Sequence, residues 1–343
     1  MKRRFGLNSQ GSILILTLWT MIFLSILAAQ LGLRVRQRAT ILSRLENKSR
    51  LYDMADAGVK KAISSLRMDF QQNPQLLSSS SKMSRHNNPE GFSHKEMKDG
   101  FFDVKYQLYD SASNPSEVRY GVVDEESKIN INTIDKTVLK NIIQQQAKLD
   151  DDGSQKLTDA IVEWRAFGKN ELVGFESDEY YSNLSDPYEP KDSFFELIEE
   201  LFLVRGVKPN YRMSLLPFLT VYGDGRININ TATRQVLVAL GVADSLADKI
   251  LFVRRGRDGV DATFDDYTFQ NPYDIASELK NFVELDPQEI KQIDFLNAMK
   301  ILKTNSFFYA IKSEARLDNR KEVVSIVCVY NIKDNRIEYW NEK

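Results

Sequence analysis

The sequence KININT at residues 128–133 returns as RININT at residues 226–231, 98 residues later. In both copies isoleucine alternates with asparagine and leads into an apolar helical pattern, IDKTVLKNII after the first and ATRQVLVALGV after the second. The alternation predicts a short extended segment with buried isoleucines. Asn and Thr side chains accept hydrogen bonds from the first turn of a helix, so Asn132 or Thr133, and Asn230 or Thr231, are predicted to cap the helices that follow.

Helical patterns dominate the chain around both motifs, while strand patterns lie on either side. FFDVKYQLYD (101–110) and EVRYGVVD (117–124) precede the helical part, and SFFYAIKSEARL, KEVVSIVCVYNI and RIEYW follow it. The last three runs are joined by turn sequences and predict a β-meander. The pattern therefore predicts an α+β fold, with an all-α domain at 125–303 inserted into a β part made of 99–124 and 304–343.

An uncharged run of 22 residues, 12–33, lies near the N-terminus. As a helix it would extend about 33 Å, enough to cross the hydrocarbon core of a bilayer. Apolar residues continue at helical spacing to residue 70, so 34–70 is predicted as an amphipathic extension of the same helix. Residues 71–98 are polar and rich in Ser and Asn, and they are predicted as a polar loop.

Charge around the span leaves its orientation open. Three basic residues precede it, and six follow it closely: Arg34, Arg36, Arg38, Arg44, Lys48 and Arg50. This count favours a cytoplasmic C-terminal side, but long domains cross a membrane largely regardless of such charges.

Composition argues against several functions. The formal net charge of −2 provides no general attraction for nucleic acid, so nucleic acid is not expected as a partner. His86, His94 and Cys328 are the only His and Cys residues, which makes a zinc site from these ligands improbable. No nucleophile–base pattern and no phosphate-binding glycine loop occurs, so we expect no enzyme.

The N-terminus resembles a known family. A basic leader that ends in Gly11, followed by an uncharged span, is similar to the class III signal of type IV pilins and pseudopilins. The resemblance implies that a prepilin peptidase cleaves between Gly11 and Ser12 and methylates the new N-terminus, leaving residues 1–11 as the leader. Most such subunits have a glutamate at the fifth mature position, where this chain has Leu16. A subunit without that carboxylate suits the first position of a filament, its tip.

The missing glutamate and a tryptophan shortly afterwards, Trp19, resemble the K-type minor pseudopilin of the type II secretion system. Further segments follow that family's order over nearly the whole chain: DEESKININT, GFESDEYY, ELIEELFLVRGV and LLPFLTVYGDGRININTAT. The resemblance implies a pilin-like sheet with a large inserted helical domain, similar to SAM-like or helix-hairpin-helix folds.

The same resemblance implies the partners and the location. It implies a tip subunit that starts pseudopilus assembly with the I- and J-type minor pseudopilins, for export of folded proteins across the outer membrane. Further implied partners are the major pseudopilin, the inner-membrane secretion platform and the prepilin peptidase. The chain would cross the inner membrane of a Gram-negative bacterium once, with its C-terminal domain in the periplasm. Binding is predicted along the N-terminal helix, at Ile41, Leu45, Tyr52, Ala55 and Val59.

Calcium is the cofactor that the resemblance implies, because K-type pseudopilins can bind it near the GFESDEYY segment. Oxygen ligands spaced closely on loops suit this ion. The corresponding residues here are Glu176, Asp178 and Glu179, with Asp186 and Asp192 as neighbours. The segment after Trp164, RAFGKN, lacks the further acids that the family often has there.

Two other functions remain open from the sequence. A minor type IV pilin would share the leader and the span but need not have the paired motifs. A membrane-anchored helix-hairpin-helix protein would bind DNA through backbone N–H groups near glycines such as Gly206, helped by neighbouring cations.

Overall fold

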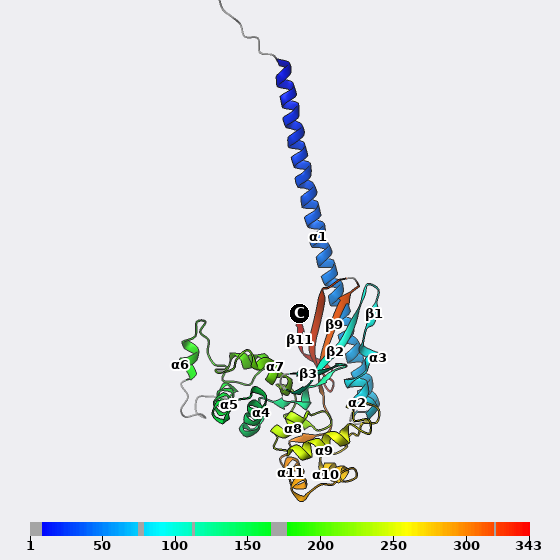
Figure 1. Ribbon diagram of the computed structural model, residues 1–343, viewed down its shortest axis with the longest axis vertical. Coiled ribbons are helices and arrows are strands. Elements are labelled where there is room, and N and C mark those ends of the chain that lie inside the picture. The colour runs from blue at the N-terminus through cyan, green and yellow to red at the C-terminus, as the bar shows by residue number, and fades with distance from the viewer. Residues whose placement is uncertain (1–8, 75–78, 112–113, 166–176, 319) are drawn as a thin grey trace, which may run out of the picture. The chain divides into compact units, whose positions relative to one another are not determined.

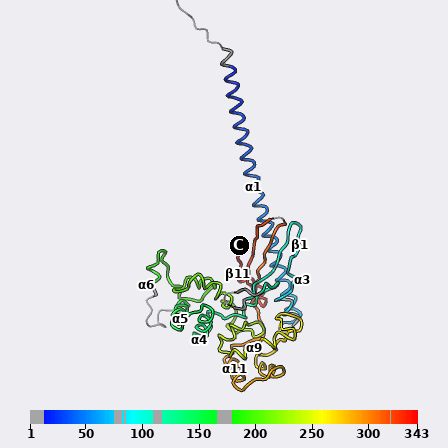
Figure 2. Tube along the Cα trace, viewed as in Figure 1, coloured from blue at the N-terminus to red at the C-terminus, as the bar shows by residue number. Residues whose placement is uncertain are grey.

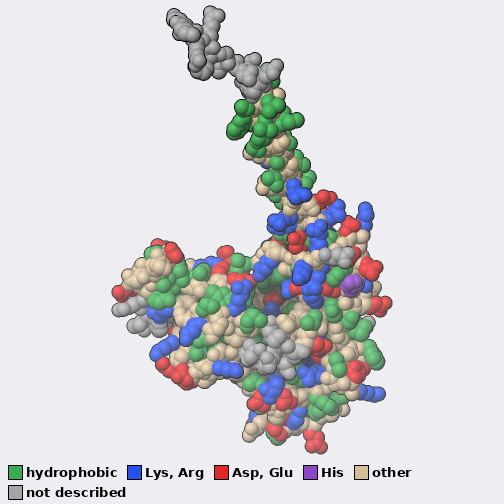
Figure 3. Space-filling view, turned by 45° about the horizontal axis from the view of Figure 1, so that its top comes forward, with side chains coloured by type: hydrophobic (Ala, Val, Ile, Leu, Met, Phe, Trp, Pro, Cys, Tyr) green, Lys and Arg blue, Asp and Glu red, His purple; other side chains and the backbone are tan. Residues whose placement is uncertain are grey.

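The computed structural model describes residues 9–74, 79–111, 114–165, 177–318 and 320–343. The chain divides into two units, Met1–Asp53 and Met54–Lys343. The first helix, α1 (Ser9–Gln72), runs through the end of the first unit into the second. In the first unit the apolar side chains of α1 from Ile13 to Leu45 are exposed (Figure 3).

In the second unit α1 packs against an antiparallel sheet. One side of the helix is buried through residues at three- and four-residue spacing: Met54, Ala55, Val59, Ala62 and Leu66. Gly58 lies on this side, and a Cβ atom there would be 2.1 Å from Ser313 Oγ and 2.8 Å from the ring of Phe102. The helix backbone therefore lies directly on strands β2 (Gly100–Ser111) and β9 (Phe308–Leu317) (Figure 1).

The sheet has the order β1 (Lys95–Met97), β2 (Gly100–Ser111), β9 (Phe308–Leu317), β10 (Val323–Asn331) and β11 (Arg336–Glu342). The second half of β2 pairs with β3 (Asn114–Tyr120), and β4 (Val123–Asp124) pairs with β9. Alternate residues of β9 are buried, as its sequence pattern requires. The predicted α+β fold, with its long N-terminal helix and its β-meander, is confirmed.

The helical part leaves the sheet after β4 and returns to it at β9, and these two strands are hydrogen-bonded to each other. Its first half contains η1 (Glu125–Ser127), β5 (Ile129–Asn130), α4 (Lys136–Ala147), α5 (Asp151–Arg165), α6 (Ser177–Ser182), η2 (Ile198–Leu203), α7 (Tyr211–Leu215), η3 (Leu216–Phe218) and β6 (Leu219–Thr220). Its second half contains β7 (Ile227–Asn228), α8 (Arg234–Ala239), α9 (Asp244–Arg254), η4 (Pro272–Asp274), α10 (Ile275–Leu279), α11 (Pro287–Ala298) and β8 (Leu302–Lys303). Figure 2 shows the path of the chain through both halves.

The predicted polar loop at 71–98 is wrong in most of its described residues. Two short helices, α2 (Ser79–His86) and α3 (Pro89–Phe92), precede β1 there. The Asn88 side chain accepts a hydrogen bond from the Gly91 N–H at 2.8 Å, and Pro89 occupies the first position of α3, where its missing N–H costs nothing. The polar residues of this segment therefore cap a helix, as Asn88 does, or form buried ion pairs, as Lys82 does with Asp266.

Candidate functional site

The KININT motif organises the first half of the helical part. β5 pairs in parallel with β6, and the Asn130 side chain accepts from the Asn132 N–H at 2.9 Å. The Asn132 side chain then binds both backbone groups of Phe195: its Nδ2 donates to the carbonyl at 2.9 Å and its Oδ1 accepts from the N–H at 2.8 Å. At the end of α5, the Arg165 guanidinium donates to the carbonyl oxygens of Ile131 and Ile134.

The RININT motif makes the same contacts in the second half. β7 pairs in parallel with β8, and Asn228 accepts from the Asn230 N–H at 3.0 Å. Asn230 binds the carbonyl and the N–H of Phe269 at 2.9 and 2.8 Å. Arg254, at the end of α9, donates to the carbonyl oxygens of Ile229 and Ala232. The helical part is therefore built from two copies of one unit, which we call the first and second repeats.

The predicted role of the motif asparagines as helix caps is wrong. The caps are Asp135 for α4 and Thr233 for α8. Asn132 and Asn230 instead hold a distant loop, because a side-chain amide offers a donor and an acceptor that match one peptide group. The predicted burial of the motif isoleucines is confirmed, since Ile129, Ile131, Ile227 and Ile229 are at most 1% exposed.

The equivalent arginines and phenylalanines were not singled out from the sequence. Arg165 and Arg254 are 89 residues apart and Phe195 and Phe269 are 74 apart, whereas the motifs are 98 apart. Because the loops of the two repeats differ in length, these equivalent residues are not separated by the same distance in the sequence as the motifs are. The only available sequence signal was an arginine at the end of the second apolar helix of each copy.

Three consecutive acids at the end of β4 join the sheet to both repeats. Asp124 accepts from Asn228 Nδ2 at 2.9 Å and Ser306 Oγ at 2.7 Å. Glu125 accepts from Thr220 Oγ1 at 2.6 Å. Glu126 forms a buried ion pair with Lys303. Burial raises the pKa of Glu126, and the attraction of Lys303 offsets this only in part. These contacts hold the carboxylates as structural links.

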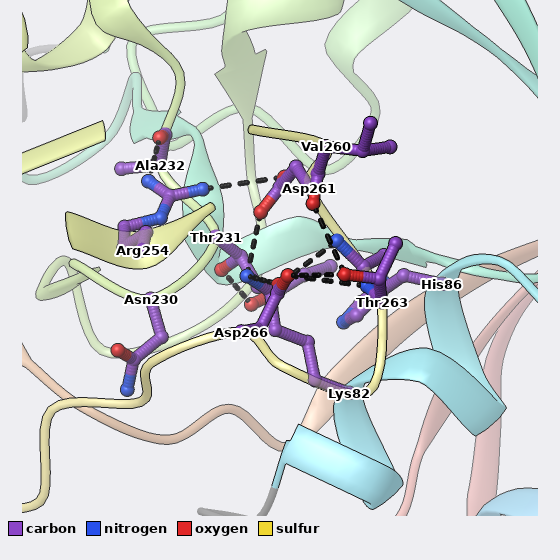
Figure 4. A network of polar contacts seen from close by, with 12 residues as sticks. Lys82, His86, Asn230, Thr231, Ala232, Arg254, Val260, Asp261, Thr263 and Asp266 are labelled. Carbon is purple, nitrogen blue, oxygen red and sulfur yellow. Dashed lines mark hydrogen bonds and ion pairs between the residues drawn. The ribbon is translucent and has the colours of Figure 1, made fainter. Parts of the chain in front are cut away.

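A second polar network connects α2 and β3 to the loop after α9 (Figure 4). The Lys82 ammonium contacts Asp261 at 2.5 Å and also pairs with Asp266. Arg254 and Arg119 approach Asp261 at 3.5 and 3.8 Å. Burial alone would raise the pKa of Asp261, but the three cations hold that pKa well below its usual range. The acids of this loop thus bind side chains of the protein itself.

The structure describes only some of the residues predicted to bind calcium. Glu179 lies in α6 and Asp186 in the segment that follows, both exposed, and Asp192 has a positive φ of 47°. Asp178 also lies in α6, while Glu176 lies outside the described residues. Among the described residues no group of three or more His, Cys, Asp or Glu side chains is placed to hold a metal ion. Because Glu176 and the Asp178 side chain lie outside what the structure describes, calcium remains a prediction.

The N-terminal helix displays only part of the predicted partner surface. Ile41 and Leu45 are 57% and 60% exposed, and Tyr52 is half-buried. Ala55 and Val59 are buried in the second unit, so their inclusion in a partner surface is wrong: helical spacing defines an apolar stripe but not what covers it. Gly11 and Ser12 lie in α1, although their side chains are outside the described residues.

The N-terminal part of α1 has the character of a membrane anchor. Leu16 is 66% exposed among other exposed apolar side chains. Within the described residues, α1 is the one helix that is long and apolar enough to cross a membrane. An apolar N-terminal helix whose C-terminal part packs on an antiparallel sheet defines a pilin-like fold, here with a helical insertion.

The comparisons relate part of the chain to one family. Residues 123–224 match the family model described as type II secretion system (T2SS), protein K. The match starts at β4 and ends after β6, so it contains the acidic run and the first repeat. Over this part of its length the chain is similar to this family, as its motifs predict.

Solved structures agree with this fold. One chain of the GspK-GspI-GspJ complex from the type 2 secretion system of enterotoxigenic Escherichia coli has a TM-score of 0.61 to this protein, with 14% sequence identity. The likeness covers 88% of this chain and 98% of that chain. At this identity it shows a common fold. No curated protein sequence matches the chain.

Proposed function

We propose that this minor pseudopilin is the tip subunit of the type II secretion pseudopilus. In this proposal it starts assembly with the I- and J-type minor pseudopilins, and the assembled pseudopilus exports folded proteins across the outer membrane. The prepilin peptidase would first cleave it after Gly11. The mature chain would cross the inner membrane once, keep its C-terminal unit in the periplasm, and contact the major pseudopilin and the secretion platform.

Leu16 is the observation that carries the proposal. A carboxylate within a membrane is costly and is kept for a partner group. Because Leu16 is exposed and uncharged, α1 has no carboxylate in the membrane that needs a partner group on a preceding subunit. Only the first subunit of a filament lacks such a predecessor.

The proposed partners rest on the solved structure with the same fold. The chain with that fold is part of a complex of GspK, GspI and GspJ. Ile41 and Leu45 offer exposed apolar contacts on α1 outside the uncharged span, where helices of neighbouring subunits could pack.

Co-purification tests this surface. We expect Leu45→Asp to reduce recovery with the I- and J-type pseudopilins at least tenfold, because a carboxylate would be buried at the contact without a partner. Leu45 is exposed, so the fold itself should be unaffected. Met68→Asp is the matched control, since Met68 is an exposed apolar residue of α1 outside the proposed surface. Unchanged recovery of the Leu45→Asp variant would rule out the surface.

Calcium binding remains part of the proposal and has its own test. Isothermal titration of the protein with calcium should release or absorb heat if Glu176, Asp178 and Glu179 form a site with their neighbours. The Glu176→Gln and Glu179→Gln variants should bind at least tenfold more weakly, because calcium requires charged oxygen ligands. No heat at millimolar calcium would remove calcium from the proposal.

A further inference from the structure

Three arginines follow the uncharged span at once. Arg34, Arg36 and Arg38 lie in α1 directly after residues 12–33, and their side chains are exposed. The first acidic residue anywhere in the chain is Glu46, which pairs with Arg50 at 2.6 Å. Within the part of the chain that the structure describes, no carboxylate pairs with the three arginines. Their charges are therefore available to a partner outside the chain.

Their position along the helix matches one layer of a membrane. At about 1.5 Å of rise per residue, Arg34 and Arg38 are separated by about 6 Å along the axis. The polar headgroup layer is about 5–7 Å thick on each side of the hydrocarbon core. When residues 12–33 cross that core, all three guanidinium groups lie at the depth of the lipid phosphates.

Their position around the helix distinguishes a lipid surface from a partner helix. Successive residues turn by about 100°, so Arg38 follows Arg34 by about 40° but Arg36 follows it by about 200°. A neighbouring helix contacts a single stripe of residues three and four apart. Lipid headgroups surround a helix on all sides, so they contact arginines on opposite sides at the same depth, which a single neighbouring helix cannot do.

We propose that Arg34, Arg36 and Arg38 form an arginine collar that binds anionic phospholipid headgroups at the C-terminal end of the span. The planar guanidinium matches two phosphate oxygens at once, and it stays charged at any physiological pH. Each cation near an anionic membrane surface strengthens association about fivefold. The collar sets the depth of the helix and keeps Ile41 and Leu45 outside the lipid, where subunits can reach them.

Lipid retention measures the collar directly. The full chain is placed in bilayer discs of equal phosphatidylglycerol and phosphatidylcholine, and native mass spectrometry counts the lipids that stay bound after release. We expect the wild-type protein to retain phosphatidylglycerol preferentially. The triple variant Arg34→Gln, Arg36→Gln, Arg38→Gln should lose at least fivefold in that preference.

Two matched variants complete the test. Arg44→Gln removes an exposed arginine about 15 Å beyond Arg34, outside the headgroup layer, and should keep the preference. Replacing the three collar arginines by lysine keeps the charge and should keep most of the preference. The proposal is overturned if the glutamine variant retains phosphatidylglycerol like the wild type, or if Arg44→Gln loses as much. Loss of partner co-purification in the glutamine variant with unchanged lipid retention would assign the arginines to a protein contact instead.

Discussion

At the scale of single residues, His86 makes stability depend on pH. Its Nδ1 lies 2.9 Å from the Val122 carbonyl oxygen, and Tyr106 donates to the His86 carbonyl at 2.9 Å. Burial, helped by repulsion from Arg85, lowers the pKa of His86 from 6.5 to about 4. Between these two values the unfolded chain binds a proton that the folded chain excludes. The neutral imidazole therefore makes its full contribution to the free energy of unfolding above pH 6.5. This contribution, about 3 kcal/mol in total, is lost as the pH falls toward 4.

Urea unfolding at pH 4.5 and pH 7 measures this effect. We expect His86→Gln to lower the stability at pH 7 but to flatten its decline toward pH 4.5, because glutamine does not titrate. His94→Gln is the control, since His94 is the exposed second histidine and should leave the decline unchanged. An equally steep decline in the His86→Gln variant would assign the pH dependence to other groups.

The sequence predicts which motif residues are buried but not what the polar ones bind. Alternation was sufficient to assign Ile129 and Ile227 to the core. An asparagine can cap a helix or hold a distant peptide group with the same amide, and the choice depends on which backbone lies nearby. The Phe195 backbone is 63 residues from Asn132 in the chain, so local sequence contains no trace of the contact.

At the scale of elements, Gly58 permits α1 to lie on the sheet. We expect Gly58→Ala to destabilise the protein by about 1–3 kcal/mol, because the added methyl group overlaps Ser313 and Phe102. Helix propensity acts in the opposite direction, by about 1 kcal/mol in favour of alanine, and it is the smaller effect. Gly32→Ala is the matched control on the same helix, since no atom lies within 4 Å of its Cβ position. Thermal unfolding of both variants decides the prediction, and equal unfolding temperatures would show that the sheet yields to the methyl group.

Helical spacing predicted the extent of α1 well, to residue 70 where the helix ends at Gln72. It could not predict that Val59 would face the protein's own sheet, because periodicity is the same whether a stripe packs within the chain or against a partner. The short helices at 79–92 were not predicted from the sequence, for a related reason. Their stability comes from contacts such as Lys82 with Asp261, 179 residues away.

At the scale of the whole molecule, strand patterns at both ends of the chain were enough to predict the class of fold. The links that join the sheet to the repeats were not predictable, since Asp124 and Glu126 contact Ser306 and Lys303 across 182 and 177 residues. Buried carboxylates at such a junction need every partner in place, because a charge left unpaired in the interior is costly. Through the three acids at the end of β4, the folded structure of both repeats therefore depends on the folded structure of the sheet.

Cleavage of the leader is the prediction that concerns the whole chain. The leader has Lys2, Arg3 and Arg4 and no acid, so its removal changes the formal net charge from −2 to −5. After a cut between Gly11 and Ser12, no charged side chain precedes Arg34. When α1 then moves from the membrane into a filament, the three cations of the leader do not have to cross the hydrocarbon core. Each such crossing would cost about 2.5–3.5 kcal/mol of free energy.

Intact mass of the protein recovered from membranes, with and without the prepilin peptidase, tests this prediction. We expect a peptidase-dependent start at Ser12 that carries one methyl group. Gly11→Leu should remain uncut, because the small residue at the cleavage position is lost, while Gly6→Leu within the same leader should be processed normally. A wild-type chain that keeps Met1 in the presence of the peptidase would make α1 a plain signal anchor. Assembly as a pilus tip would then be excluded, since the leader would hold the helix in the membrane.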